Sequence, residues 1–174
     1  MTHPAFDMPA PWRPLHAARI PSEDAMTAWA ARLAPVLRAG DALLLSGDLG
    51  SGKTHFARGL IRARLGPDGA MAEVPSPSFT LVQTYDTPGA EVWHADLYRL
   101  TDPQEVWELG LDAAMDEAVC LIEWPDRWAD PWPATAAGIA LSVPQTAPDT
   151  RDATIWAGSE GNLAARVVSA LTSP

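Results

Sequence analysis

The sequence is poor in cysteine, in lysine and in long apolar runs. Its one cysteine, Cys120, has no partner for an internal disulfide, and no cysteines and histidines have the spacing of zinc ligands. No apolar stretch approaches the ~20 residues that a membrane-spanning helix needs, and the proline-rich start of the chain lacks the pattern of a secretory signal. We therefore expect a cytoplasmic protein that does not contact a membrane.

Positive charge is also scarce. The chain has 12 Lys and Arg against 22 Asp and Glu, which gives a formal net charge of −10. Such a chain repels a phosphate backbone, which argues against direct binding to DNA or RNA. Any role in RNA chemistry is expected to pass through a partner protein.

The length of 174 residues suits one domain. We expect residues 1–18 to form a flexible N-terminal extension and residues 19–174 to form a single domain. Strands that alternate with helices, together with hairpin-like pairs, predict a three-layer α/β fold with a mixed, partly antiparallel central sheet. The apolar pattern and the turn signals predict a first helix capped by Ser22 and ended by Gly40, further helices over 55–65, 103–109 and 161–171, and strands over 42–45, 79–85, 92–95, 118–122, 139–143 and 153–156.

Residues 47–54, GDLGSGKT, match the phosphate-binding loop of P-loop NTPases, with a predicted strand before it and a predicted helix after it. The three glycines allow positive φ and bring backbone N–H groups close to phosphate oxygens. The Thr54 hydroxyl is placed to bind Mg²⁺, which bridges the β- and γ-phosphates of a bound nucleotide. The predicted nucleotide-binding loop comprises Gly47, Asp48, Leu49, Gly50, Ser51, Gly52, Lys53, Thr54 and His55.

Lys53 is the only lysine in a chain that otherwise uses arginine. A compact ammonium on a flexible stem can extend along the loop to the β- and γ-phosphates, whereas the planar guanidinium of Arg is too bulky for that volume. We interpret Lys53 as the residue that neutralises the transferred phosphate.

Two carboxylates follow predicted strands. Glu123 ends the run Ala-Val-Cys-Leu-Ile-Glu, and Asp96 ends Val-Trp-His-Ala-Asp. Ligands gather at the carboxyl ends of strands in open α/β sheets, so either acid can hold Mg²⁺ or its water. Spacing alone leaves open which of them, alongside Thr54, contacts the metal.

Three neighbouring positions are less specific. His94 is interpreted as a packed or hydrogen-bonded histidine rather than a catalytic one. Trp124 either covers the nucleotide or fills the core. The stiff, hydroxyl-rich segment 75–79, which contains Ser78, is either a loop that senses the γ-phosphate or a simple turn.

In four segments the chain resembles the TsaE family of bacterial P-loop ATPases. These are GDLGSGKT, SPSFTLVQTY, WHADLYRL followed by ELGL, and LIEWPDR, and the resemblance extends from about residue 19 to the C-terminus. It implies a role in making N6-threonylcarbamoyladenosine at position 37 of tRNA. It also implies ATP as substrate, Mg²⁺ as cofactor and the TsaD–TsaB heterodimer as partner, with tRNA met only through that complex.

The same resemblance implies roles for individual residues. Thr54 and Glu123 would hold Mg²⁺, Asp96 would lie near the γ-phosphate or the attacking water, and Trp124 would lie close to the nucleotide. Glu23 and Arg151 align with positions that approach the nucleotide. One departure stands out: Ser78 replaces the usual Thr, so the hydroxyl is kept but the methyl that restricts its rotamer is lost.

Two other functions fit the phosphate-binding loop. A small-molecule P-loop kinase would carry clustered arginines on a lid, but Arg58, Arg62 and Arg64 fall on the helix behind the loop and residues 65–98 contain no arginine. A nucleotide-gated binding module would hydrolyse ATP rarely. The favoured hypothesis is an ATPase subunit, with catalysis by Lys53, Asp96 and Glu123, that is slow without its partners.

Overall fold

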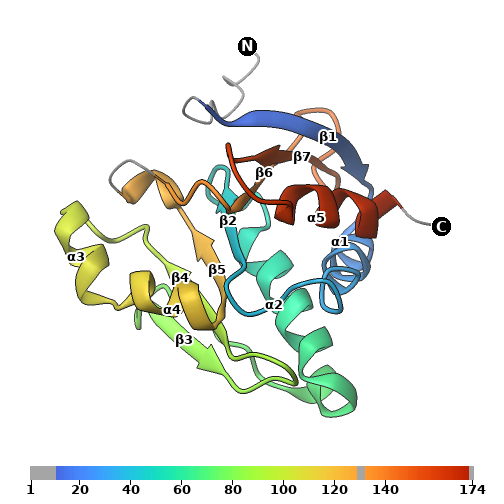
Figure 1. Ribbon diagram of the computed structural model, residues 1–174. Helices are drawn as coiled ribbons and strands as arrows, with labels where there is room; N and C mark the ends of the chain where they lie inside the picture. The colour runs from blue at the N-terminus through green and yellow to red at the C-terminus, as the bar shows by residue number, and fades with distance from the viewer. Residues whose placement is uncertain (1–10, 129–131, 173–174) are drawn as a thin grey trace.

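The computed structural model describes residues 11–128 and 132–172, which form one twisted sheet covered by helices (Figure 1). The sheet has seven strands in the order β1-β7-β6-β2-β5-β4-β3. The strands are β1 (Arg13–Ile20), β2 (Ala42–Ser46), β3 (Val82–Tyr85), β4 (Val92–Asp96), β5 (Val119–Glu123), β6 (Ala137–Ser142) and β7 (Arg151–Ala157), and the α-helices are α1 (Glu23–Ala31), α2 (Lys53–Arg64), α3 (Pro103–Glu108), α4 (Leu111–Glu117) and α5 (Leu163–Thr172).

The four central strands β6, β2, β5 and β4 are parallel, and the outer pairs β1–β7, β6–β7 and β3–β4 are antiparallel. This confirms the prediction of an α/β fold with a mixed sheet. The parallel centre explains why β2 and β5 consist entirely of buried residues, since helices cover both faces of such strands. Within the described ranges, no helix has the length and apolar character needed to cross a membrane.

Alternation along the strands divides the core into two layers. Leu43, Leu45 and Leu121 face the layer that holds α1, α2 and α5, and this layer includes Phe56. The intervening residues, such as Leu44, face α3, α4 and a group of tryptophans. The phosphate-binding loop therefore starts from the middle of the sheet and leads into a helix that lies on one defined face.

The assignment of residues 1–18 to a flexible extension is wrong for residues 13–18. They belong to β1, which pairs antiparallel with β7 along most of its length. Trp12, just before the strand, is buried and packs edge-on against Trp132 with ring centroids 5.7 Å apart. Because β1 is a largely exposed edge strand, its residues lack the apolar alternation that would have marked it. Residues 1–10 lie outside the described part of the chain.

Other boundaries differ for local reasons. The first helix ends at Ala31 instead of continuing toward Gly40, because the ring of Pro35 clashes with a helical carbonyl four residues earlier. Strand β3 starts at Val82 and not at residue 79, because Leu81 closes a turn onto the Pro77 carbonyl at 2.7 Å. The sequence pattern did not indicate α4, a helix of only seven residues. Residues 125–127 form a single 3-10 turn, and residues 129–131 lie outside the described residues.

The packing of Trp12 generates a test of the N-terminal strand. Trp12→Ala is expected to lower the free energy of unfolding by roughly 3 kcal/mol, as truncation of a buried Trp does. Leu15→Ala, in the exposed part of β1, is the control and should cost much less. Urea denaturation followed by circular dichroism measures both. Equal, small shifts would show that this segment does not pack on the sheet.

Candidate nucleotide-binding site

The phosphate-binding loop connects β2 to α2. The structure confirms positive φ at the glycines, with 132° at Gly47, 79° at Gly50 and 105° at Gly52. Gly47 is the most restricted of them, because a Cβ there would collide with the backbone oxygen of Leu141 on β6. Gly52 is the N-cap of α2, so the positive end of that helix faces the space enclosed by the loop.

Lys53 fills the loop with its ammonium group. Nζ donates hydrogen bonds to the carbonyl oxygens of Gly47, at 2.7 Å, and Asp48, at 2.9 Å. It also lies 3.8 Å from the centroid of the Trp124 ring. Burial lowers the pKa of Lys53, and the negative charges of Glu123 and Asp96 oppose that shift. Anionic groups thus surround the only ammonium side chain of the protein.

Strand register brings the two candidate carboxylates together. On β4 and β5, alternate residues that end at Asp96 and Glu123 point toward the face that α2 covers. Asp96 and Glu123 are direct partners in the parallel pairing of these strands. The sheet therefore places both acids beside the first turn of α2.

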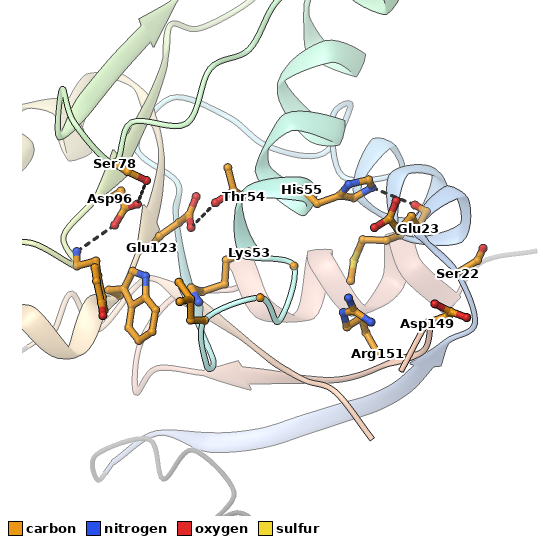
Figure 2. A pocket seen from close by; sticks show the side chains of 16 residues that line it. Ser22, Glu23, Lys53, Thr54, His55, Ser78, Asp96, Glu123, Asp149 and Arg151 are labelled. Atoms are coloured by element: carbon orange, nitrogen blue, oxygen red, sulfur yellow. Dashed lines mark hydrogen bonds between the residues drawn. The ribbon is translucent and has the colours of Figure 1, made fainter. Parts of the chain in front are cut away.

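The two carboxylates have different partners. Glu123 Oε2 accepts a hydrogen bond from the Thr54 hydroxyl at 2.8 Å. Asp96 accepts from the Ser78 hydroxyl on Oδ2, at 2.9 Å, and from the Tyr98 backbone N–H on Oδ1, at 3.0 Å. Thus Glu123 is linked to the loop helix, and Asp96 is linked to the segment that carries Ser78 (Figure 2).

The structure confirms His94 as a packed, hydrogen-bonded histidine. It is fully buried, and its Nε2 lies 2.8 Å from Glu123 Oε1. Ser78 is also bonded to the Ser76 hydroxyl at 2.7 Å, and its own hydroxyl attaches this turn to Asp96.

The oxygen atoms at this point fit Mg²⁺. Thr54, Glu123 and Asp96 offer hard donors, and Mg²⁺ prefers to combine one or two protein oxygens with phosphates and water. No group of three or more His, Cys, Asp or Glu that could enclose a metal by itself occurs in the part of the chain described here. The donor set therefore fits a metal that a substrate brings with it better than a permanent metal centre.

A pocket of about 300 Å³ runs along the loop. Figure 2 shows Asp96 and Ser78 at one end, Lys53 and Thr54 in the middle, and Glu23 and Arg151 at the other end. The predicted residues that line it are Glu23, Leu49, Gly50, Gly52, Lys53, Thr54, His55, Ser78, Asp96, Glu123, Trp124 and Arg151. Gly47, Asp48 and Ser51 belong to the loop but are not lining residues.

Pairing of β1 with β7 forms the end of the pocket that lies away from the carboxylates. Ile20 pairs with Arg151, which brings the start of α1 next to the start of β7. Arg151 Nε donates to the Ser51 carbonyl at 3.0 Å, and His55 Nε2 lies 3.1 Å from the Glu23 carbonyl oxygen. Glu23 and Arg151 therefore share one wall of the pocket.

Sequence reasoning missed four lining residues: Ser22, Met26, Tyr98 and Asp149. Tyr98 and Asp149 each lie two positions from a predicted site residue, and Tyr98 also belongs to the segment WHADLYRL that carries the family resemblance. Met26 belongs to a core layer and also lines the pocket, so it lies at the boundary of the two.

Trp124 lines the pocket and also packs against the core layer that contains α3 and α4. Its backbone has φ of 58°, which is unusual for a bulky residue and aims the ring back over Lys53.

Known proteins resemble this chain both in sequence and in structure. The family model of threonylcarbamoyl adenosine biosynthesis protein TsaE matches residues 20–153. TsaE of Rickettsia bellii is 42% identical over 105 residues, which are 60% of this chain and 71% of that protein. TsaE of Streptomyces coelicolor is 36% identical over 124 residues, which are 70% of this chain and 80% of that protein. For Rickettsia felis TsaE, at 44% identity over 94 residues, the match spans 54% of this chain and about half (53%) of that protein. The crystal structure of Bacillus subtilis YdiB superposes with a TM-score of 0.69 at 26% identity, over 92% of this chain and 95% of that one.

The loop geometry predicts unequal effects of two glycine substitutions. Gly50→Ala places a side chain in open space at positive φ and should cost about 1–2 kcal/mol of stability. Gly47→Ala adds a collision with Leu141 and should cost clearly more. Chemical denaturation of both variants measures the difference. Equal losses would mean that β6 does not constrain the loop.

Proposed function

The chain belongs to the TsaE family of tRNA threonylcarbamoyladenosine biosynthesis proteins, and from that premise we propose that it is an ATP-hydrolysing subunit. It binds ATP with Mg²⁺ and acts in the cytoplasm with TsaD and TsaB, and it meets tRNA only through that complex. The observation that carries this proposal is the convergence of Lys53, Thr54, Asp96 and Glu123 on one pocket.

In this proposal the loop binds the triphosphate. The backbone N–H groups of residues 47–52 and the start of α2 face the β- and γ-phosphates. Lys53 Nζ then donates to phosphate oxygens in place of the carbonyls of Gly47 and Asp48. The negative charge of the phosphates stabilises the ammonium, whose pKa is lowered by burial.

Thr54 and Glu123 would hold Mg²⁺, which would supply charge neutralisation at the phosphates. Their 2.8 Å hydrogen bond already places both oxygens side by side. Asp96 is held by Ser78 and by the Tyr98 backbone. In this proposal it orients the attacking water and accepts its proton. The two acids therefore take separate tasks.

Slow hydrolysis by the isolated chain is expected. Arg151 lines the pocket, and its guanidinium donates hydrogen bonds to the carbonyls of Ser51, Pro148 and Thr150. A partner that supplies or positions a further positive charge would accelerate the reaction.

The arginines of α2 argue against a small-molecule kinase. Arg58 and Arg62 donate to the carbonyls of Val74 and Ala72, and Arg64 donates to those of Ala34 and Leu37. These contacts attach flanking segments to the helix. None of the three arginines lines the pocket, so they do not form a lid over the phosphates.

Lys53 is the residue to test first. Lys53→Ala should weaken nucleotide binding by roughly 100-fold or more, because two charge-assisted hydrogen bonds to phosphate are lost. Lys53→Arg should fail as well, since the guanidinium keeps the charge but not the shape. Isothermal titration calorimetry with a non-hydrolysable ATP analogue measures both, and circular dichroism checks the fold. Normal binding by the Ala variant would contradict the loop assignment, and normal binding by the Arg variant would contradict the shape argument.

Reconstitution with TsaD and TsaB tests the proposed role. ATP loss should rise when the partners are added, and threonylcarbamoyladenosine in tRNA should fall when the chain is left out or carries Lys53→Ala. Both are measured in one reaction, by phosphate release and by nucleoside mass spectrometry. Unchanged modification without the chain, combined with phosphorylation of a small acceptor, would favour the kinase.

A further inference from the structure

His94 occupies a position where the surrounding pattern predicts an apolar residue. It lies in the interior of β4 on the face toward α2, between Val92 and Asp96 on that face, and it is fully buried. Its direct partner on β5 is Leu121, which belongs to the same core layer. A buried histidine here requires a reason other than packing.

The imidazole reaches one group of the site. His94 Nε2 lies 2.8 Å from Glu123 Oε1, and because a carboxylate oxygen accepts, the imidazole N–H donates. Glu123 lies two residues beyond Leu121, so the side chain leans diagonally across the strand pair to make this bond. The other carboxylate oxygen, Oε2, accepts from Thr54. Glu123 is thus held on both oxygens by β4 and α2.

The second ring nitrogen of His94 has no partner. Nδ1 is buried and makes no hydrogen bond with any described residue. Leaving a buried polar atom unpaired costs free energy, and an apolar side chain of similar volume would avoid that cost. The position therefore retains a polar group at a loss of stability, and among the described residues the hydrogen bond of its side chain is to Glu123 alone.

We propose that His94 is a positioning residue that fixes the carboxylate of Glu123 so that Oε2 stays directed at Thr54 and at the bound Mg²⁺. The inference rests on the proposed nucleotide site. A glutamate side chain has three rotatable bonds, and a carboxylate held by one partner can swing, whereas one held by two partners keeps a single orientation. Outer hydrogen-bond partners of this kind orient metal ligands in many proteins.

Asp96 shows the contrast. Its two oxygens are held by a hydroxyl of a loop and by a backbone N–H of its own strand end, and both groups are partly accessible to solvent. Glu123 is 1% exposed, and the imidazole that holds it is fully buried. Asp96 is also buried, at 5% exposed, and is also held on two oxygens, so the two acids differ in the elements that hold them and not in the number of their partners.

The test compares His94→Gln with His94→Leu in the full chain. The Gln amide can place an N–H near the position of Nε2, whereas Leu keeps the volume without a donor. Binding of a non-hydrolysable fluorescent ATP analogue is followed as Mg²⁺ is added, and again in EDTA. His94→Leu should raise the Mg²⁺ concentration at half-saturation by about 10-fold or more, with unchanged affinity in EDTA. His94→Gln should recover most of the loss.

Two further measurements separate positioning from simple packing. If His94 acts through Glu123, adding His94→Leu to Glu123→Ala should cause no further change in the Mg²⁺ midpoint. A purely structural role would lower the melting temperature and leave that midpoint unmoved. If the Leu variant does not fold, His94→Asn replaces it, because its shorter amide stops short of Glu123.

The outcomes decide the inference and the proposed function separately. Equal Mg²⁺ midpoints in wild type, Gln and Leu variants, or additive effects with Glu123→Ala, overturn the role of His94 while nucleotide binding stands. A wild-type chain that binds no nucleotide overturns the proposed function, and the inference with it. Recovery by Gln together with non-additivity supports the inference.

Discussion

The ammonium of Lys53 and the anionic space around it determine the layout of the site. Bringing that charge out of water is unfavourable, as the lowered pKa of Lys53 indicates, so the neighbouring groups must compensate. Two loop carbonyls bind it, and the charges of Glu123 and Asp96 oppose the shift. A polyphosphate would meet the same need more fully. The site is thus organised around one buried cation.

The register of the strands places Asp96 and Glu123 around Lys53. Because β4 and β5 are parallel and in direct register at their ends, two acids from distant parts of the chain face the same helix turn. Parallel strands collect their carboxyl ends at one edge, and α2 begins at that edge because the loop follows β2, the neighbour of β5. The antiparallel outer strands complete the other end, where β1 and β7 bring Glu23 and Arg151 to one wall.

Three features that lower stability lie at the site. Trp124 and Leu81 hold positive φ although neither is glycine. The Nδ1 atom of His94 is unpaired in the interior. Each of these features lowers stability, and each lies beside a group that the site uses: Trp124 over Lys53, Leu81 next to the loop of Ser78, and His94 on Glu123. Their cost is acceptable because two well-packed core layers support the sheet on both faces.

The sequence by itself determined the parts of this protein whose causes are local. The phosphate-binding loop is contiguous, so the demands on Gly47, Gly52, Lys53 and Thr54 could be read from spacing. Buried strands that end in an acid likewise indicated Asp96 and Glu123. Residue spacing left open which acid meets Thr54, and strand register decides that it is Glu123, 69 residues away. Tertiary structure also decided that residues 13–18 join the sheet, because an exposed edge strand is specified by its partner β7 and not by its own pattern.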